Sequence, residues 1–275
     1  MKRVMLIILA LVAIAYTGLC AALYAFQRNL LYSPPPPSAR NTTGTMVVPT
    51  ATDRVLASIK PREGRDAVIY FGGNGEDVSY SLPTLAKAFP DHALYLLHYR
   101  GFGGSSGTPS EAAMFGDALT LFDHVHAAHD RIVVIGSSLG TGVATYLSSL
   151  RPVVRLVLVT PYDSLQEIYA AKLTLLPVRW LILDKFESWK YAAGVTAPTL
   201  VLAAENDEMI PRASTEQLFS RFKNGPASLK IVPGVTHNSI YQSPQYVPLL
   251  RESKANLRGV CREDLTAQAE RTCGN

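Results

Sequence analysis

The feature that most constrains the fold is a run of β-branched residues that ends in Gly-x-Ser-x-Gly, from Gly136 to Gly140. Small, helix-compatible residues follow, so the stretch predicts a strand, a sharp turn and a helix. In such a turn Ser138 takes a strained backbone conformation, and the two glycines let strand and helix approach closely. The positive end of the new helix points at the Ser138 hydroxyl. Ser138 is therefore a candidate nucleophile, and an ordinary strand-to-helix turn is the alternative.

Strands and helices alternate over residues 45–258, which predicts an α/β domain with a mostly parallel sheet covered on both faces. Buried strands are expected at 67–71, 93–97, 131–135, 154–159, 199–203 and 229–232, edge strands at 47–48 and 55–59, and a helix at 111–128. Residues 161–194 break the alternation and are rich in apolar side chains. We interpret them as short helices that form a small lid over the carboxyl edge of the sheet. A crossover packed on the core is the alternative.

Composition excludes some partners. Only 17% of the 275 residues are charged and the net charge is +4, with no dense basic patch interleaved with aromatics, so nucleic acid is not an expected partner. No Cys/His cluster has metal-ligand spacing, and no metal is expected.

The amino terminus predicts a membrane anchor over residues 1–32. Lys2 and Arg3 precede an uncharged, mostly aliphatic run from Val4 to Phe26, which is long enough to cross a bilayer. The basic start keeps the amino terminus in the cytoplasm and places the domain outside it, in the periplasm if the cell is bacterial. The alternative is a cleaved signal peptide, because Ala13-Ile14-Ala15 looks like a cleavage site. A proline-rich linker, residues 33–44, follows the anchor.

Three cysteines are present: Cys20 in the apolar run, and Cys261 and Cys273 in a carboxy-terminal tail, residues 259–275. In an oxidising compartment the last two could form a disulfide. Two free thiols in a loose tail are the alternative.

His237 is the candidate base, because it follows the last predicted strand on a Gly-containing loop. Its imidazole needs a carboxylate to fix its tautomer. Three acids follow the strand at 199–203, and we choose Asp207 over Glu205 and Glu208 because a short acid in a turn is easier to immobilise. The order Ser, Asp, His matches the order that such an α/β architecture uses.

An oxyanion formed by attack of Ser138 would need two backbone donors. Leu139 N–H, directly after the serine, is the first. Gly72-Gly73-Asn74-Gly75 supplies the second, with Asn74 N–H preferred and Gly73 N–H as runner-up. A glycine-rich turn could instead cradle a phosphate, but neither the dinucleotide nor the P-loop spacing is present.

Taken together, these pieces resemble the α/β-hydrolase superfamily, and within it the membrane-anchored serine hydrolases related to depalmitoylating enzymes. The resemblance runs from the anchor to about Tyr246. Its motifs are residues 26–32, 70–75, 99–107 and 136–140, with Asp207 and His237. Gly72 departs from the pattern, because relatives usually carry His there.

The resemblance implies a hydrolase of carboxylic esters or thioesters that needs no cofactor and acts on small ester, thioester or lipid-like substrates. Two other functions stay open from the sequence: a serine peptidase of the same fold, and a catalytically silent envelope scaffold.

Overall fold

The computed structural model describes residues 1–36 and 44–252. Eight strands form one sheet in the order β1-β2-β4-β3-β5-β6-β7-β8. β2 is antiparallel to β1 and β4, and all pairs from β4 to β8 are parallel. The predicted mostly parallel sheet is thus confirmed. The strands are β1 (Thr45–Val48), β2 (Val55–Lys60), β3 (Asp66–Phe71), β4 (Ala93–His98), β5 (Arg131–Ser137), β6 (Arg155–Val159), β7 (Thr199–Asn206) and β8 (Ala227–Thr236).

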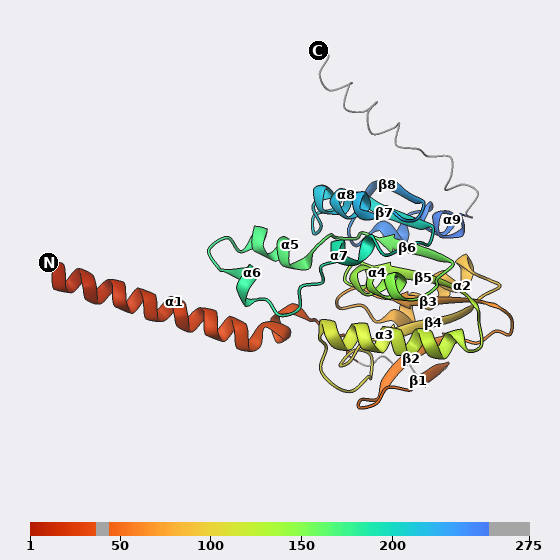
Figure 1. Ribbon diagram of the computed structural model, residues 1–275, viewed down its shortest axis with the longest axis horizontal. Helices are drawn as coiled ribbons and strands as arrows, with labels where there is room; N and C mark the ends of the chain where they lie inside the picture. The colour runs from red at the N-terminus through yellow and green to blue at the C-terminus, as the bar shows by residue number, and fades with distance from the viewer. Residues whose placement is uncertain (37–43, 253–275) are drawn as a thin grey trace, which may run out of the picture.

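Helices cover both faces of the sheet, and each face has its own hydrophobic core (Figure 1). One core includes α3, α4, α7 and α8, and the other includes α2 and α9. After a charged first residue, the central strands β3, β5 and β6 are almost entirely apolar, because both of their faces are buried. The helices of the domain are α2 (Leu82–Ala88), α3 (Glu111–His126), α4 (Gly140–Leu150), α5 (Leu165–Lys172), α6 (Val178–Leu181), α7 (Trp189–Ala192), α8 (Arg212–Arg221) and α9 (Tyr246–Arg251), with 3-10 turns η2 (Val78–Tyr80) and η3 (Ile240–Gln242).

Helix α1 (Lys2–Leu31) projects from the domain as a single rod (Figure 1). It is 30 residues long, apolar, and long enough to cross a membrane. The segment predicted as a lid, residues 161–194, contains α5, α6 and α7, and α5 and α6 lie beside the carboxy-terminal half of α1 (Figure 1). Cys20 is a free thiol. The possible Cys261–Cys273 disulfide lies outside the described residues.

The turn between β5 and α4 depends on glycine at both ends. A Cβ at Gly136 would lie 2.5 Å from the Gly140 carbonyl oxygen, and one at Gly140 would lie 2.1 Å from the Phe71 carbonyl oxygen. Backbone atoms cannot move aside as a flexible side chain would. Close contact between β3, β5 and α4 therefore requires these two glycines.

We expect Gly140→Ala to destabilise the fold by about 3 kcal/mol or more, because the added methyl overlaps main-chain atoms of β3. Gly116→Ala is the matched control: it lies inside α3 with nothing within 4 Å of the new Cβ, and should stabilise the helix by up to about 1 kcal/mol. Thermal or urea unfolding of both variants measures the difference. Equal stability of the two would contradict this account of the turn.

Candidate active site

The strand-turn-helix predicted around Ser138 is present. β5 ends at Ser137 and α4 begins at Gly140, so the turn is only two residues long. Ser138 has φ +47°, in the left-handed region, and its N–H donates to the Val159 carbonyl of the neighbouring strand at 2.9 Å. Its side chain is partly exposed. The turn thus holds the hydroxyl at the carboxyl edge of the sheet, where a substrate can reach it.

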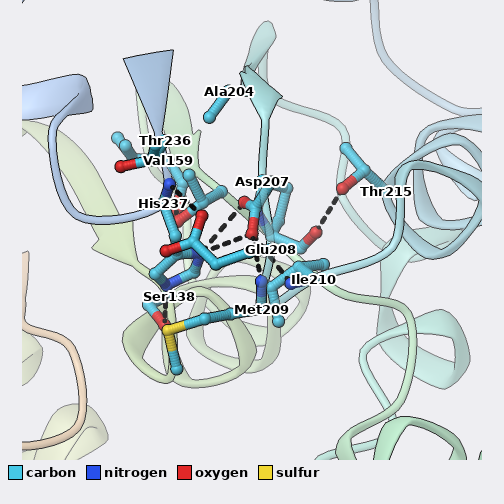
Figure 2. Close-up of polar contacts among 12 residues, drawn as sticks. Ser138, Val159, Ala204, Asp207, Glu208, Met209, Ile210, Thr215, Thr236 and His237 are labelled. Carbon is cyan, nitrogen blue, oxygen red and sulfur yellow. Dashed lines mark hydrogen bonds and ion pairs between the residues drawn. The ribbon is translucent and has the colours of Figure 1, made fainter.

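The structure brings the three predicted polar residues together (Figure 2). His237 Nε2 lies 2.9 Å from Ser138 Oγ, and His237 Nδ1 lies 3.0 and 2.9 Å from the two Asp207 carboxylate oxygens. Ser138 follows β5, Asp207 follows β7 and His237 follows β8, so the carboxyl ends of parallel strands supply all three. This arrangement can take a proton from the serine and stabilise the imidazolium that forms.

Asp207 is held as a carboxylate. Half-burial alone would raise the pKa of its carboxyl, but hydrogen bonds from His237 and from the Ile210 and Met209 N–H groups outweigh that effect and lower the pKa below its usual value. Because the folded pKa is lowered, the ionised carboxylate stabilises the fold at neutral pH. That contribution is lost as the pH falls through the lowered pKa.

The two neighbouring acids have other partners. Glu205 Oε2 accepts from the Gly234 N–H at 2.7 Å. Glu208 Oε2 accepts from the main-chain N–H of His237 at 3.3 Å and does not bond the ring. Both glutamates therefore support the loop that carries His237, and only Asp207 orients the imidazole.

The turn after β3 presents one of its two predicted donors. Gly73 N–H donates to Glu76 Oε2 at 2.7 Å and is therefore occupied. Within the described residues, Asn74 N–H and Leu139 N–H have no hydrogen-bond acceptor. Gly73 lies against the serine, since a Cβ there would be 3.5 Å from Ser138 Cβ. The pattern favours Asn74 over Gly73 as a donor to a ligand beside Ser138.

Sequence reasoning missed Glu76, which organises this turn. Besides Gly73 N–H, its carboxylate accepts from the Tyr70 hydroxyl at 2.8 Å and the Ser81 hydroxyl at 2.6 Å. A Cβ at Gly72 would lie 2.5 Å from Val78 Cγ1 and 3.0 Å from Glu76 Oε2. The absence of a side chain at position 72 was the signal, because Glu76 and Val78 fill that space.

Comparison with known proteins places this site in a family. Residues 66–175 match the alpha/beta hydrolase fold family. An uncharacterised protein of Mycobacterium tuberculosis is 34% identical over 255 residues, covering 84% of this chain and 87% of its own length. The chain belongs to the alpha/beta hydrolase family. Protein bem46 of Schizosaccharomyces pombe is 26% identical and covers 84% of this chain and 86% of its own length.

Two further similar proteins are a lipase and an esterase. Lysophosphatidylserine lipase ABHD12 of Macaca fascicularis is 30% identical, and the match covers 67% of this chain but only 54% of that protein. The structure of the Pyrococcus furiosus esterase Pf2001 superposes with a TM-score of 0.62 at 16% identity, covering 78% of this chain and 93% of the esterase. At that identity the superposition shows the fold alone.

In this alpha/beta hydrolase the end of α1 contacts the site directly. The Asn74 side-chain amide donates to the Leu31 carbonyl at 2.7 Å, and its oxygen accepts from Ser33 N–H at 3.0 Å. One turn earlier, Arg28 forms a double hydrogen bond with the buried Asp184, which also accepts from the Tyr32 hydroxyl at 3.0 Å. The last turn of α1 is therefore bonded both to the Asn74 turn and to residues 161–194, the segment predicted as a lid.

Proposed function

We propose that the chain is a membrane-anchored serine hydrolase of carboxylic esters or thioesters, with lipid-like molecules among its substrates. The observation that carries the proposal is the hydrogen-bonded line from Asp207 through His237 to Ser138, at the head of α4. The lipase relatives support a lipid-like ester. Helix α1, uncharged from Val4 to Gln27, supports anchoring, and Lys2 and Arg3 favour a domain on the non-cytoplasmic side.

In the proposed reaction Ser138 Oγ attacks the carbonyl carbon while His237 Nε2 accepts its proton. Asp207 stabilises the resulting imidazolium through Nδ1. The developing oxyanion lies between Leu139 N–H and Asn74 N–H, at the positive end of α4. Because both donors belong to the main chain and have no other acceptor in the described residues, they need no rearrangement to bind it.

Collapse of the tetrahedral intermediate releases the alcohol or thiol, to which His237 returns the proton, and leaves an acyl group on Ser138. Water then attacks the acyl-enzyme, with His237 again as the base, and frees the acid. Each proton that His237 accepts, first from Ser138 and then from water, it gives up again, first to the leaving group and then to Ser138. No step calls on a cofactor.

Labelling of the full-length protein in membranes with a fluorophosphonate probe tests this function. We expect one probe molecule per chain, attached to Ser138, and loss of hydrolysis of a water-soluble ester in step with labelling. A library of esters and thioesters of increasing chain length then defines the acyl preference. Intact folded protein that neither reacts with the probe nor cleaves any ester would contradict the proposal and favour a silent scaffold.

A further inference from the structure

Residues 173–183, here called the lid tip, leave the body of the domain and lie along α1 (Figure 1). The Tyr16 hydroxyl donates to the Leu175 carbonyl at 2.9 Å. Eleven residues further along α1, Gln27 donates to the Leu181 carbonyl at 3.1 Å and accepts from Leu183 N–H at 2.7 Å. At 1.5 Å per residue the lid tip therefore follows α1 for about 16 Å.

These contacts set the depth of the lid tip relative to a bilayer. About 20 helical residues cross the hydrocarbon, which is about 30 Å thick. A span that starts at Val4, directly after the charged Lys2 and Arg3, ends near Leu23. Tyr16 then lies about 10 Å inside the hydrocarbon, and a span that starts later in the chain places it deeper. The Leu175 carbonyl that Tyr16 binds lies at the same depth.

The surface of the lid tip suits that depth. Leu175 and Trp180 are 86% and 88% exposed, large apolar side chains with nothing covering them in the domain. The one charged residue of the tip, Arg179, is paired with Glu167 at 2.6 Å. Many main-chain groups of the tip are also satisfied, for example Leu176 N–H by Leu173 and Ile182 N–H by Val178, which lowers the cost of moving the tip out of water.

A groove lies between the lid tip and α1. Leu23 and Leu30 of α1 face Leu176, Val178 and Ile182 of the lid across it. Its volume of about 130 Å³ is small beside the 300–1,000 Å³ of a site for a drug-sized ligand. It can take a segment of one acyl chain, not a whole lipid. Gln27 and Tyr169 are the residues of its lining with polar side-chain atoms, and Gln27 is already bonded to the lid main chain.

Both walls of the groove lead to the candidate active site. The α1 wall ends at Leu31, whose carbonyl is bonded to Asn74. The other wall includes α5, and Lys172 at the end of α5 donates to the Met209 carbonyl at 3.2 Å, two residues after Asp207. A chain held in the groove is therefore flanked by elements that continue to the two sides of the Ser138 site.

We propose that the lid tip is embedded in the leaflet next to the domain, and that the groove between it and α1 is occupied by an acyl chain of a membrane lipid. The inference rests on the membrane insertion of α1 proposed above. It makes the lid a second, shallow membrane contact. It also gives a lipid substrate a sideways route from the leaflet, with its tail in the apolar groove.

Tryptophan fluorescence in liposomes made with brominated phosphatidylcholine tests the depth. The chain has two tryptophans, so Trp189→Phe leaves Trp180 as the only reporter and Trp180→Phe leaves Trp189. Leu175→Trp, in a chain with both tryptophans replaced by phenylalanine, reports on the tip. We expect strongest quenching of Trp180 by bromines near the glycerol and of the position-175 reporter by bromines at mid-chain. Trp189 should respond weakly to both.

The proposal would be overturned if aqueous iodide quenched the Trp180 and position-175 reporters and neither of the two brominated lipids did.

The groove is tested with a phosphatidylcholine that carries a photoreactive diazirine at mid-chain. Adducts should form on Ile182 and disappear in Val178→Trp, which fills the groove, while adducts on Leu175 remain. Adducts confined to Leu175 in the parent protein would exclude an occupied groove. All lipid measurements use the full-length chain with Ser138→Ala in addition, so no lipid is hydrolysed during them. Fluorophosphonate labelling is measured separately on the protein that keeps Ser138. Lipid contact in the first experiment and no labelling in the second would reject only the proposed function.

Discussion

Replacing Ser138 by alanine should lower ester turnover by roughly four to six orders of magnitude. The Oγ atom that lies 2.9 Å from His237 Nε2 disappears, and the adjacent hydroxyls of Ser137 and Thr141 are bonded to other groups. Binding and the two main-chain donors remain, so a small residual rate over water is expected. Turnover of a water-soluble ester and fluorophosphonate labelling of the same samples measure the effect.

The neighbouring serine is the matched control. Ser137 Oγ is 2.6 Å from the Tyr241 hydroxyl and is fully buried, so it cannot reach a substrate. Ser137→Ala should keep fluorophosphonate labelling and most of the turnover. Labelling that survives in Ser138→Ala and vanishes in Ser137→Ala would show that the nucleophile has been misassigned.

Asp207→Asn should lower turnover by about four orders of magnitude. The amide has nearly the same shape, but it cannot stabilise the imidazolium, and its NH₂ group can hold the imidazole in the wrong tautomer. Fluorophosphonate labelling should slow in parallel, while the circular dichroism spectrum should stay that of the parent protein.

Glu205→Gln and Glu208→Gln separate this role from a general need for negative charge. Their carboxylates bind main-chain N–H groups of the His237 loop, and an amide oxygen can accept the same bonds. We expect each to retain turnover to within about tenfold, a loss of about 1.4 kcal/mol in transition-state stabilisation. If either glutamine variant loses most of its ester turnover while Asp207→Asn keeps a turnover near that of the parent protein, Asp207 is the wrong choice of acid.

Local signals explain why so much of the site could be predicted. The turn at Ser138 is specified by five residues, Gly136 to Gly140. Their two glycines are needed because a Cβ at either position would overlap main-chain atoms of a neighbouring element. Asp207 and His237 each follow a readable strand, and carboxyl ends of parallel strands meet at one edge. Strand and helix boundaries mostly fell within a few residues of the structure, because buried strands and helices have distinct periodicities.

The features that could not be predicted depend on side chains far apart in the sequence. Arg28 and Asp184 are 156 residues apart, and no local pattern marks them as partners. Asn74 was chosen for its main-chain N–H, while its side chain turned out to bind the end of α1. Glu76 looked like an ordinary loop acid, because its role depends on the space left by Gly72. Sequence periodicity records burial, not which polar groups pair across the fold.

The bonds between Asn74 and residues 31 and 33 join the end of α1 directly to the turn beside Ser138. A membrane-spanning helix adjusts its tilt to the thickness of the bilayer around it. In this chain the helix ends in a carbonyl held by the residue whose N–H we assign to the oxyanion. With α1 inserted as we propose, a change in its tilt would act on the Asn74 turn through this bond, and the thickness of the bilayer would act on the rate as an effector with no binding site of its own.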